Sequence, residues 1–154
     1  MATIVVGTDD SPGGRRAVRW ALDEARIRGA ELVVVHAWIM PLVDALPEPW
    51  VLATPVGHTD DRLHERLAQE AGALLDGVVA AAKEAEPGVT VRGELVEGRP
   101  AAALLEAARG ADLLVVGSRG HGGFAGLVLG SVSSQCVHHG PCPVAVVPGE
   151  PAGN

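Results

Sequence analysis

Short runs of aliphatic and β-branched residues alternate with longer amphipathic segments along this chain. Unbroken apolar runs of four to eight residues are typical of strands that are buried on both faces of a sheet. The runs that predict strands lie at residues 3–8, 32–37, 113–116 and 143–147, and a partly alternating pattern predicts a further strand at residues 89–96.

The segments between these runs have the periodicity and end signals of helices. Asp10 or Ser11 is expected to cap the first helix, which has Pro12 in its first turn and ends at Gly29. We expect one side of it to be buried, carrying Ala17, Trp20, Ala21 and Ala25.

A second, longer helix is predicted from a cap at Thr59 or Asp60 to Pro87-Gly88. Its apolar residues recur every three or four positions, which predicts one buried stripe. The predicted stripe consists of Leu63, Leu67, Ala71, Leu74, Val78 and Ala81. Shorter helices are expected after Pro100 and from Ser131 to His139.

Strands and helices therefore alternate, and this order predicts a parallel sheet with helices on both faces. We expect a single doubly wound, Rossmann-like α/β domain over residues 1–148, with a five-stranded sheet in the order 3-2-1-4-5. A disordered tail is expected at residues 149–154. Residues 38–58 contain four prolines and predict an irregular segment.

The composition and charge of the chain argue against several classes of partner and site. The net charge is -7, which argues against a nucleic-acid partner. Lys83 is the only lysine, so a Walker A loop is excluded and a Schiff-base lysine is disfavoured. The N-terminus does not resemble a signal peptide, and no apolar stretch is long enough to span a membrane. These features predict a cytoplasmic protein that does not bind membranes.

Two loops at strand ends are expected to share one crevice. Gly7-Thr8-Asp9 ends the first strand, and six glycines lie between Gly117 and Gly130 after the fourth. Ligands of open α/β sheets bind where the strand order reverses, and glycine-rich backbone at a helix N-terminus suits phosphate. A tight or flexible turn explains the glycines equally well, and the Ser131 hydroxyl can cap the helix, contact phosphate or do both.

The chain resembles the universal stress proteins over nearly its whole length. The pattern Gly-x2-Gly-x9-Gly-Ser is present as Gly117, Gly120, Gly130 and Ser131, and Val-Gly-Thr-Asp ends the first strand. The resemblance implies the ATP-binding branch of that family, with ATP bound together with Mg²⁺. It also implies a nucleotide-responsive stress protein and a homodimer paired through Pro143–Val147.

The resemblance also implies a set of nucleotide-binding residues. Asp9 has an independent rationale, since a carboxylate at a strand end can accept from ribose hydroxyls or assist a metal. Asp10 is then left as the helix cap, and Arg119 either contacts phosphate or lies in solvent. The implied site consists of Gly7, Thr8, Asp9, Ala37, Val116, Gly117, Arg119, Gly120, Gly130, Ser131 and Val132.

Other functions are less well supported by the residues. Cys136, His138, His139 and Cys142 are too closely spaced for a typical zinc site, so we expect no metal ligands there. No arrangement of nucleophile and base is evident, and no catalytic residue is predicted. Weak ATP hydrolysis, or binding of another adenine nucleotide such as cyclic AMP, are the alternatives.

Overall fold

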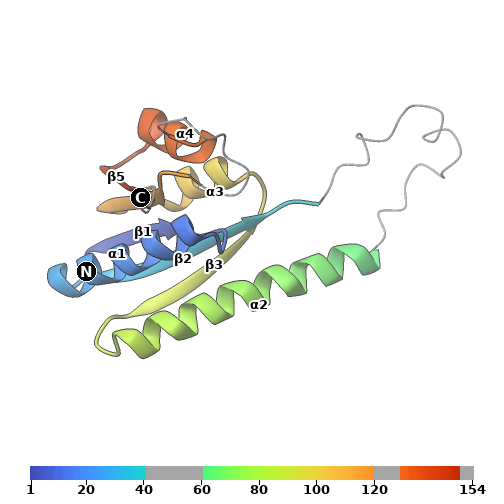
Figure 1. Cartoon of the computed structure of the whole chain (residues 1–154), viewed down its shortest axis with the longest axis horizontal. Coiled ribbons are helices and arrows are strands. Elements are labelled where there is room, and N and C mark those ends of the chain that lie inside the picture. The colour runs from blue at the N-terminus through green and yellow to red at the C-terminus, as the bar shows by residue number, and fades with distance from the viewer. Residues whose placement is uncertain (41–60, 120–128, 150–154) are drawn as a thin grey trace, which may run out of the picture.

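The computed structural model describes residues 1–40, 61–119 and 129–149. Within these residues five strands and four helices alternate along the chain (Figure 1). The elements are β1 (Thr3–Gly7), α1 (Pro12–Arg28), β2 (Glu31–Trp38), α2 (Asp61–Ala85), β3 (Val91–Glu97), α3 (Pro100–Ala107), β4 (Leu113–Gly117), α4 (Ser131–His139) and β5 (Val144–Val147).

All neighbouring strands pair in parallel, and the strand order is β3-β2-β1-β4-β5. The predicted fold and strand order are therefore confirmed. The sheet lies between α1 and α2 on one face and α3 and α4 on the other (Figure 1).

Alternate side chains of the central strands supply two separate cores. Val6 and Leu32 face α1 and α2, whereas Val5 and Val33 face α3 and α4. Because both faces are covered by helices, the central strands read as continuous apolar runs in the sequence.

Both ends of α1 are set by capping residues. Ser11 is the N-cap, and its hydroxyl accepts a hydrogen bond from the Gly14 amide. Gly29 ends the helix in a left-handed conformation with φ 64°. Ala17, Ala21 and Ala25 are fully buried as predicted, but Trp20 is 37% exposed. Trp20 directly precedes Ala21, and consecutive residues of a helix point in different directions, so the Trp20 side chain lies outside the buried stripe.

The buried face of α2 also differs from the prediction. Ala71 is buried as expected. The other buried residues of the helix are Leu75 and Ala82, whereas the prediction placed Leu74 and Ala81 on the buried stripe. Ala81 is exposed, and Leu63, Leu67, Leu74 and Val78 are half-buried. The proposed caps Thr59 and Asp60, most of the proline-rich segment and residues 150–154 lie outside the described residues. None of the described helices is both long and apolar enough to cross a membrane.

Candidate functional site

The candidate site lies where the sheet changes direction, beyond the carboxyl ends of β1 and β4. These two strands are paired neighbours, yet the chain leaves β1 toward α1 on one face and leaves β4 toward α4 on the other. The loops therefore turn to opposite faces of the sheet, and we call the region between them the crevice, because it is the position at which open α/β sheets bind ligands.

On the β1 side, Asp9 is held by the cap of α1. Its Oδ1 accepts from the Ser11 amide at 3.0 Å and also from the Ser11 hydroxyl. The same hydroxyl accepts from Gly14, so the helix start and the carboxylate are fixed by one side chain. Asp9 is half-buried just beyond the end of β1.

Asp10 does not cap the helix, contrary to the prediction. It adopts φ 59°, a left-handed conformation that Asp tolerates better than most residues. Its Oδ1 lies 3.3 Å from the guanidinium of Arg15, whose Nη1 also donates to the Asp10 carbonyl at 2.9 Å. The left-handed turn at Asp10 directs the chain back so that Ser11 takes the cap position.

His36 supports this loop from β2. Its Nδ1 lies 2.8 Å from the carbonyl oxygen of Thr8, and the ring is buried. Because a carbonyl only accepts, Nδ1 carries the proton. The Thr8 amide in turn donates to the Val35 carbonyl at 2.9 Å, so β2 holds Thr8 through both of its backbone polar groups.

On the β4 side, Ser118 connects three segments, a role that sequence reasoning missed. Its carbonyl accepts from the Gly130 amide at 2.7 Å and from the Ser133 hydroxyl at 3.0 Å. Its amide donates to the Val147 carbonyl at 2.9 Å, and its hydroxyl accepts from the Gly149 amide at 3.2 Å. Ser118 therefore fixes the start of α4 and the end of β5 beside the end of β4.

The N-terminus of α4 has no side-chain cap. Its N-cap is Gly130, which has no side chain to accept from the first amides of the helix. Ser131 is the first helical residue, and its hydroxyl accepts from the Gln135 side chain at 3.1 Å instead of capping the helix. The amides of this first turn are thus left as donors for an anion.

The two loops meet through backbone atoms. A Cβ atom at Gly117 would lie 3.0 Å from the Gly13 carbonyl oxygen, so the α1 start and the β4 end are too close for a side chain at this point. Gly130 is also part of this contact region, because its Cβ position lies 3.6 Å from Arg119 Cα. The structure therefore brings Gly117, Arg119 and Gly130 together.

The other predicted site residues lie around this centre. Gly7 ends β1 against Leu104 of α3, and Ala37 lies near the end of β2. Val116 is buried in the core beneath α3 and α4, and the half-buried Val132 packs against that core. Gly120 lies outside the described residues.

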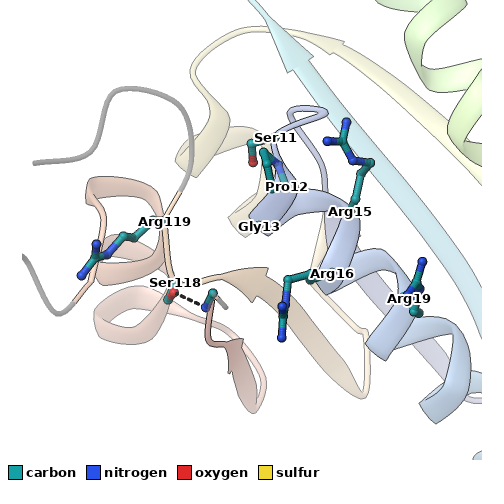
Figure 2. Close-up of a pocket in the computed structure, with 9 residues that line it drawn as sticks. Ser11, Pro12, Gly13, Arg15, Arg16, Arg19, Ser118 and Arg119 are labelled. Atoms are coloured by element: carbon teal, nitrogen blue, oxygen red, sulfur yellow. Dashed lines mark hydrogen bonds between the residues drawn. The ribbon is translucent and has the colours of Figure 1, made fainter. Parts of the chain in front are cut away.

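A cavity of about 460 Å³ opens on the α1 side of the crevice (Figure 2). It is lined by the first two turns of α1, by Ser118 and Arg119, and by Gly149. The basic side chains in its lining are Arg15, Arg16, Arg19 and Arg119.

The last turns of α4 carry Cys136, His138 and His139. Cys136 is fully buried, and burial raises the pKa of its thiol from 9.0 to about 11, so it stays protonated at neutral pH. Across residues 1–40, 61–119 and 129–149, no three His, Cys, Asp or Glu side chains are grouped to hold a metal ion.

Comparison with known proteins gives one consistent result. The model of the universal stress protein family matches residues 1–148. A universal stress protein from Mycolicibacterium smegmatis is 40% identical over 94% of this chain and 45% of its own length. Another from Thermus aquaticus is 37% identical over 94% of this chain and 97% of its own. The chain thus spans about half the length of the mycobacterial relative.

Solved structures agree with the fold. The crystal structure of a universal stress protein in complex with cAMP superposes with a TM-score of 0.64. That protein is 31% identical to this chain, and the match covers 95% of each.

Proposed function

Because the chain belongs to the universal stress protein family, we propose that its crevice binds an adenine nucleotide, ATP with Mg²⁺, and that the protein acts as a nucleotide-responsive stress module. The observation that carries the proposal is the uncapped start of α4, which Ser118 holds beside the end of β4. Helix amides that the N-cap residue does not cap suit phosphate, and the carboxylate on the neighbouring strand suits ribose.

Different residues of the crevice would contact different parts of the ligand. Gly130, Ser131 and Val132 would bind phosphate oxygens through the start of α4, with Gly117, Arg119 and Gly120 along the nucleotide. Gly7, Asp9 and Ala37 would surround ribose and adenine with Thr8 beside them, and Val116 would also line the nucleotide. Asp9 suits the ribose role because the Ser11 contacts hold its carboxylate in one orientation.

A single carboxylate also fits the expected role of Mg²⁺. This ion keeps several waters and is usually bound through substrate phosphates and one or two carboxylates. Asp9 is the carboxylate at this point in the crevice, and a phosphate chain would supply the other ligands. Mg²⁺ would neutralise charge on the phosphates.

Cyclic AMP is the second candidate, because the 31% identical structure was solved with cAMP. A cyclic monophosphate carries one phosphate and needs fewer amide donors than ATP does. Titration of the protein with ATP–Mg²⁺, AMP and cAMP therefore separates the two candidates. Tighter binding of ATP than of cAMP would support the proposal. Tighter binding of cAMP would contradict it and favour cAMP as the ligand.

The direct test is to denature the purified protein and identify any released nucleotide by chromatography. The matched variant is Gly130→Asp. Gly130 has φ -73° and ψ 172°, which any residue adopts, and a Cβ there would lie 3.3 Å from the Ser118 carbonyl oxygen, a contact that needs only a small shift. Asp is a good N-cap, so the new carboxylate would occupy the amides itself and keep α4 folded.

Gly77→Asp serves as the control, because Gly77 lies on α2 with open space around it and the added charge is the same. We expect the parent and Gly77→Asp to bind ATP and Gly130→Asp to lose binding. A parent that releases no nucleotide and fails to bind added ATP–Mg²⁺ would rule out the ATP proposal. ADP recovered after incubation with ATP would indicate slow hydrolysis.

We also propose that two copies pair through β5. This strand lies at the sheet edge, and Val144, Ala145 and Val146 are half-buried. The carbonyls of Pro143 and Val147 accept from β4, so alternation directs the backbone groups of Val144 and Val146 away from β4. An unpaired apolar edge of this kind is a template for a second strand.

The variant Val146→Pro tests this pairing, because it removes an outward amide without removing a hydrogen bond to β4. Light scattering should give a dimer for the parent and a monomer for the variant. A parent that is monomeric at high concentration would contradict the proposal.

A further inference from the structure

Helix α1 carries two large apolar side chains that the fold leaves exposed. Trp20 is 37% exposed and Ile27 is 68% exposed. The two residues are seven positions apart, which is about two helical turns, so they lie on one side of the helix. Aromatic side chains in such positions are enriched at protein interfaces.

This side of α1 faces away from α2, the other described helix on this face of the sheet. Arg26 marks the side toward α2, because its guanidinium lies 3.3 Å from the carboxylate of Glu86 just after that helix. Figure 2 shows Arg15 and Arg16 leaving α1 on opposite sides. Trp20 follows Arg16 by about one turn and therefore shares its side. Since α1 contacts both α2 and the edge strand β5, the Trp20 side lies over the β5 edge.

Trp20 is level with the start of β5. A Cβ atom at Gly117 would stand 3.0 Å from the Gly13 carbonyl oxygen, and Gly117 pairs with Val147 in the sheet register, so Gly13 marks the end of β5 on the helix. From Gly13 to Trp20 the helix advances by about 10 Å. From Val147 back to Val144 the strand covers about the same distance. Trp20 therefore stands beside the open edge of the sheet.

The β5 edge alone is too small to hold two copies together. Its four residues give a strand about 13 Å long. A specific interface buries about 800 Å² on each partner, which corresponds to a square patch roughly 28 Å wide. Helix α1 has 17 residues and is about 26 Å long, so its outer side extends the edge to the size that a stable dimer needs.

We propose that Trp20 anchors the interface between two copies of this chain, with Ile27 on the same side of α1; the inference rests on the proposed pairing of β5. A twofold axis uses the same surface of both copies, so the Trp20 side of each α1 faces the other copy. Antiparallel pairing centred on β5 places Val144 opposite Val147 of the second copy. The Trp20 ring then packs beside the carboxyl end of that strand and loses its exposure to water.

The test measures the dissociation constant of the dimer by analytical ultracentrifugation over a range of protein concentrations. Leu95→Ala is the matched control for Trp20→Ala, because Leu95 is 41% exposed on β3, at the opposite edge of the sheet. We expect the Kd to rise about tenfold or more in Trp20→Ala, since interface tryptophans are frequent hot spots, and to stay unchanged in Leu95→Ala. Tryptophan emission of the parent should shift to shorter wavelength as the dimer forms, and Trp20→Phe should lose this shift while still dimerising.

A dimer as tight in Trp20→Ala as in Leu95→Ala would overturn the inference. If Trp20→Ala does not fold, Ile27→Glu decides the question in the same way, because a side chain that is 68% exposed can be replaced without disturbing the core. Val146→Pro separates this inference from the strand pairing. A monomeric Val146→Pro beside a tight Trp20→Ala dimer would leave the β5 pairing standing and remove the role of Trp20. The opposite result would keep Trp20 and contradict the strand pairing, and a parent that stays monomeric would contradict both.

Discussion

The backbone of Arg119 lies directly against Gly13. A Cβ atom at Gly13 would stand 2.6 Å from the Arg119 carbonyl oxygen, a distance that real Cβ atoms do not show. The loop after β4 and the first turn of α1 are therefore in backbone contact across the crevice. The position of one loop fixes the position of the other.

Replacing Gly13 by Ala should destabilise the protein by about 1–3 kcal/mol, because backbone atoms must move to admit the methyl group. Gly77→Ala is the control, since open space surrounds Gly77 on α2. It should stabilise the protein by up to about 1 kcal/mol, as expected for an exposed helical glycine. Urea unfolding measures both, and equal stabilisation in the two variants would contradict the contact.

Ser133→Ala should reduce the free energy of unfolding by about 1–2 kcal/mol. The buried Ser133 hydroxyl lies 3.0 Å from the Ser118 carbonyl and 3.1 Å from that of Gly130, and the variant leaves both without this donor. The neighbouring Ser134→Ala is the control, and it should have a much smaller effect. Nucleotide affinity should fall in Ser133→Ala and not in Ser134→Ala, because the Ser133 hydroxyl donates to the carbonyls of Ser118 and Gly130 at the start of α4.

Neutral His36 should carry its proton on Nδ1. The Thr8 carbonyl lies 2.8 Å from this nitrogen and accepts only. Nitrogen chemical shifts of the imidazole, measured by NMR with ¹⁵N-labelled protein, distinguish the two neutral tautomers directly. A protonated Nε2 with a bare Nδ1 would show that His36 does not hold Thr8.

Stability should fall at alkaline pH because of Cys136. Burial raises the pKa of this thiol from 9.0 to about 11, so the unfolded chain releases its proton first. The stabilising effect is complete below pH 9 and is lost as the pH rises toward 11. The loss amounts to about 2 to 3 kcal/mol. In Cys136→Ala, which retains Cys142, urea unfolding across pH 8–11 should lack this component, and a parallel decline in both proteins would contradict it.

Much of the fold can be predicted from the sequence because parallel central strands leave a strong signal. The run at 113–116 predicts β4 to within one residue of Leu113–Gly117, since Asp112 and the glycine-rich segment bound it. Alternation and the usual handedness of crossovers reduce the possible strand orders to a few, and the observed order is one of them. The face of α2 was harder to assign, because its alanines, leucines and valines surround the helix. Moving from Leu74 to Leu75 rotates the buried direction by about 100°.

The details of the site depend on contacts that leave no local pattern. Ser118 and Ser133 are joined through a backbone carbonyl, and every residue has one, so nothing in the sequence marks this pairing. Ser11 caps α1 in place of Asp10 because Asp10 adopts a left-handed backbone conformation. The local sequence does not determine which of the two residues takes the cap position. The place of Asp9 just beyond the end of β1 could be predicted because a strand end is itself a local signal, and its role toward a ligand stays a prediction.

The division of the interior into two cores has a mechanical consequence. Helix α1 packs with α2 on one core, and α4 packs with α3 on the other. The two sides of the crevice thus belong to different layers, and they come into backbone contact where Gly13 lies against Gly117 and Arg119. A shift of α1 relative to β4 would therefore change the width of the crevice at the Gly13 contact, while the hydrogen bonds of Ser118 keep α4 and β5 attached to the end of β4.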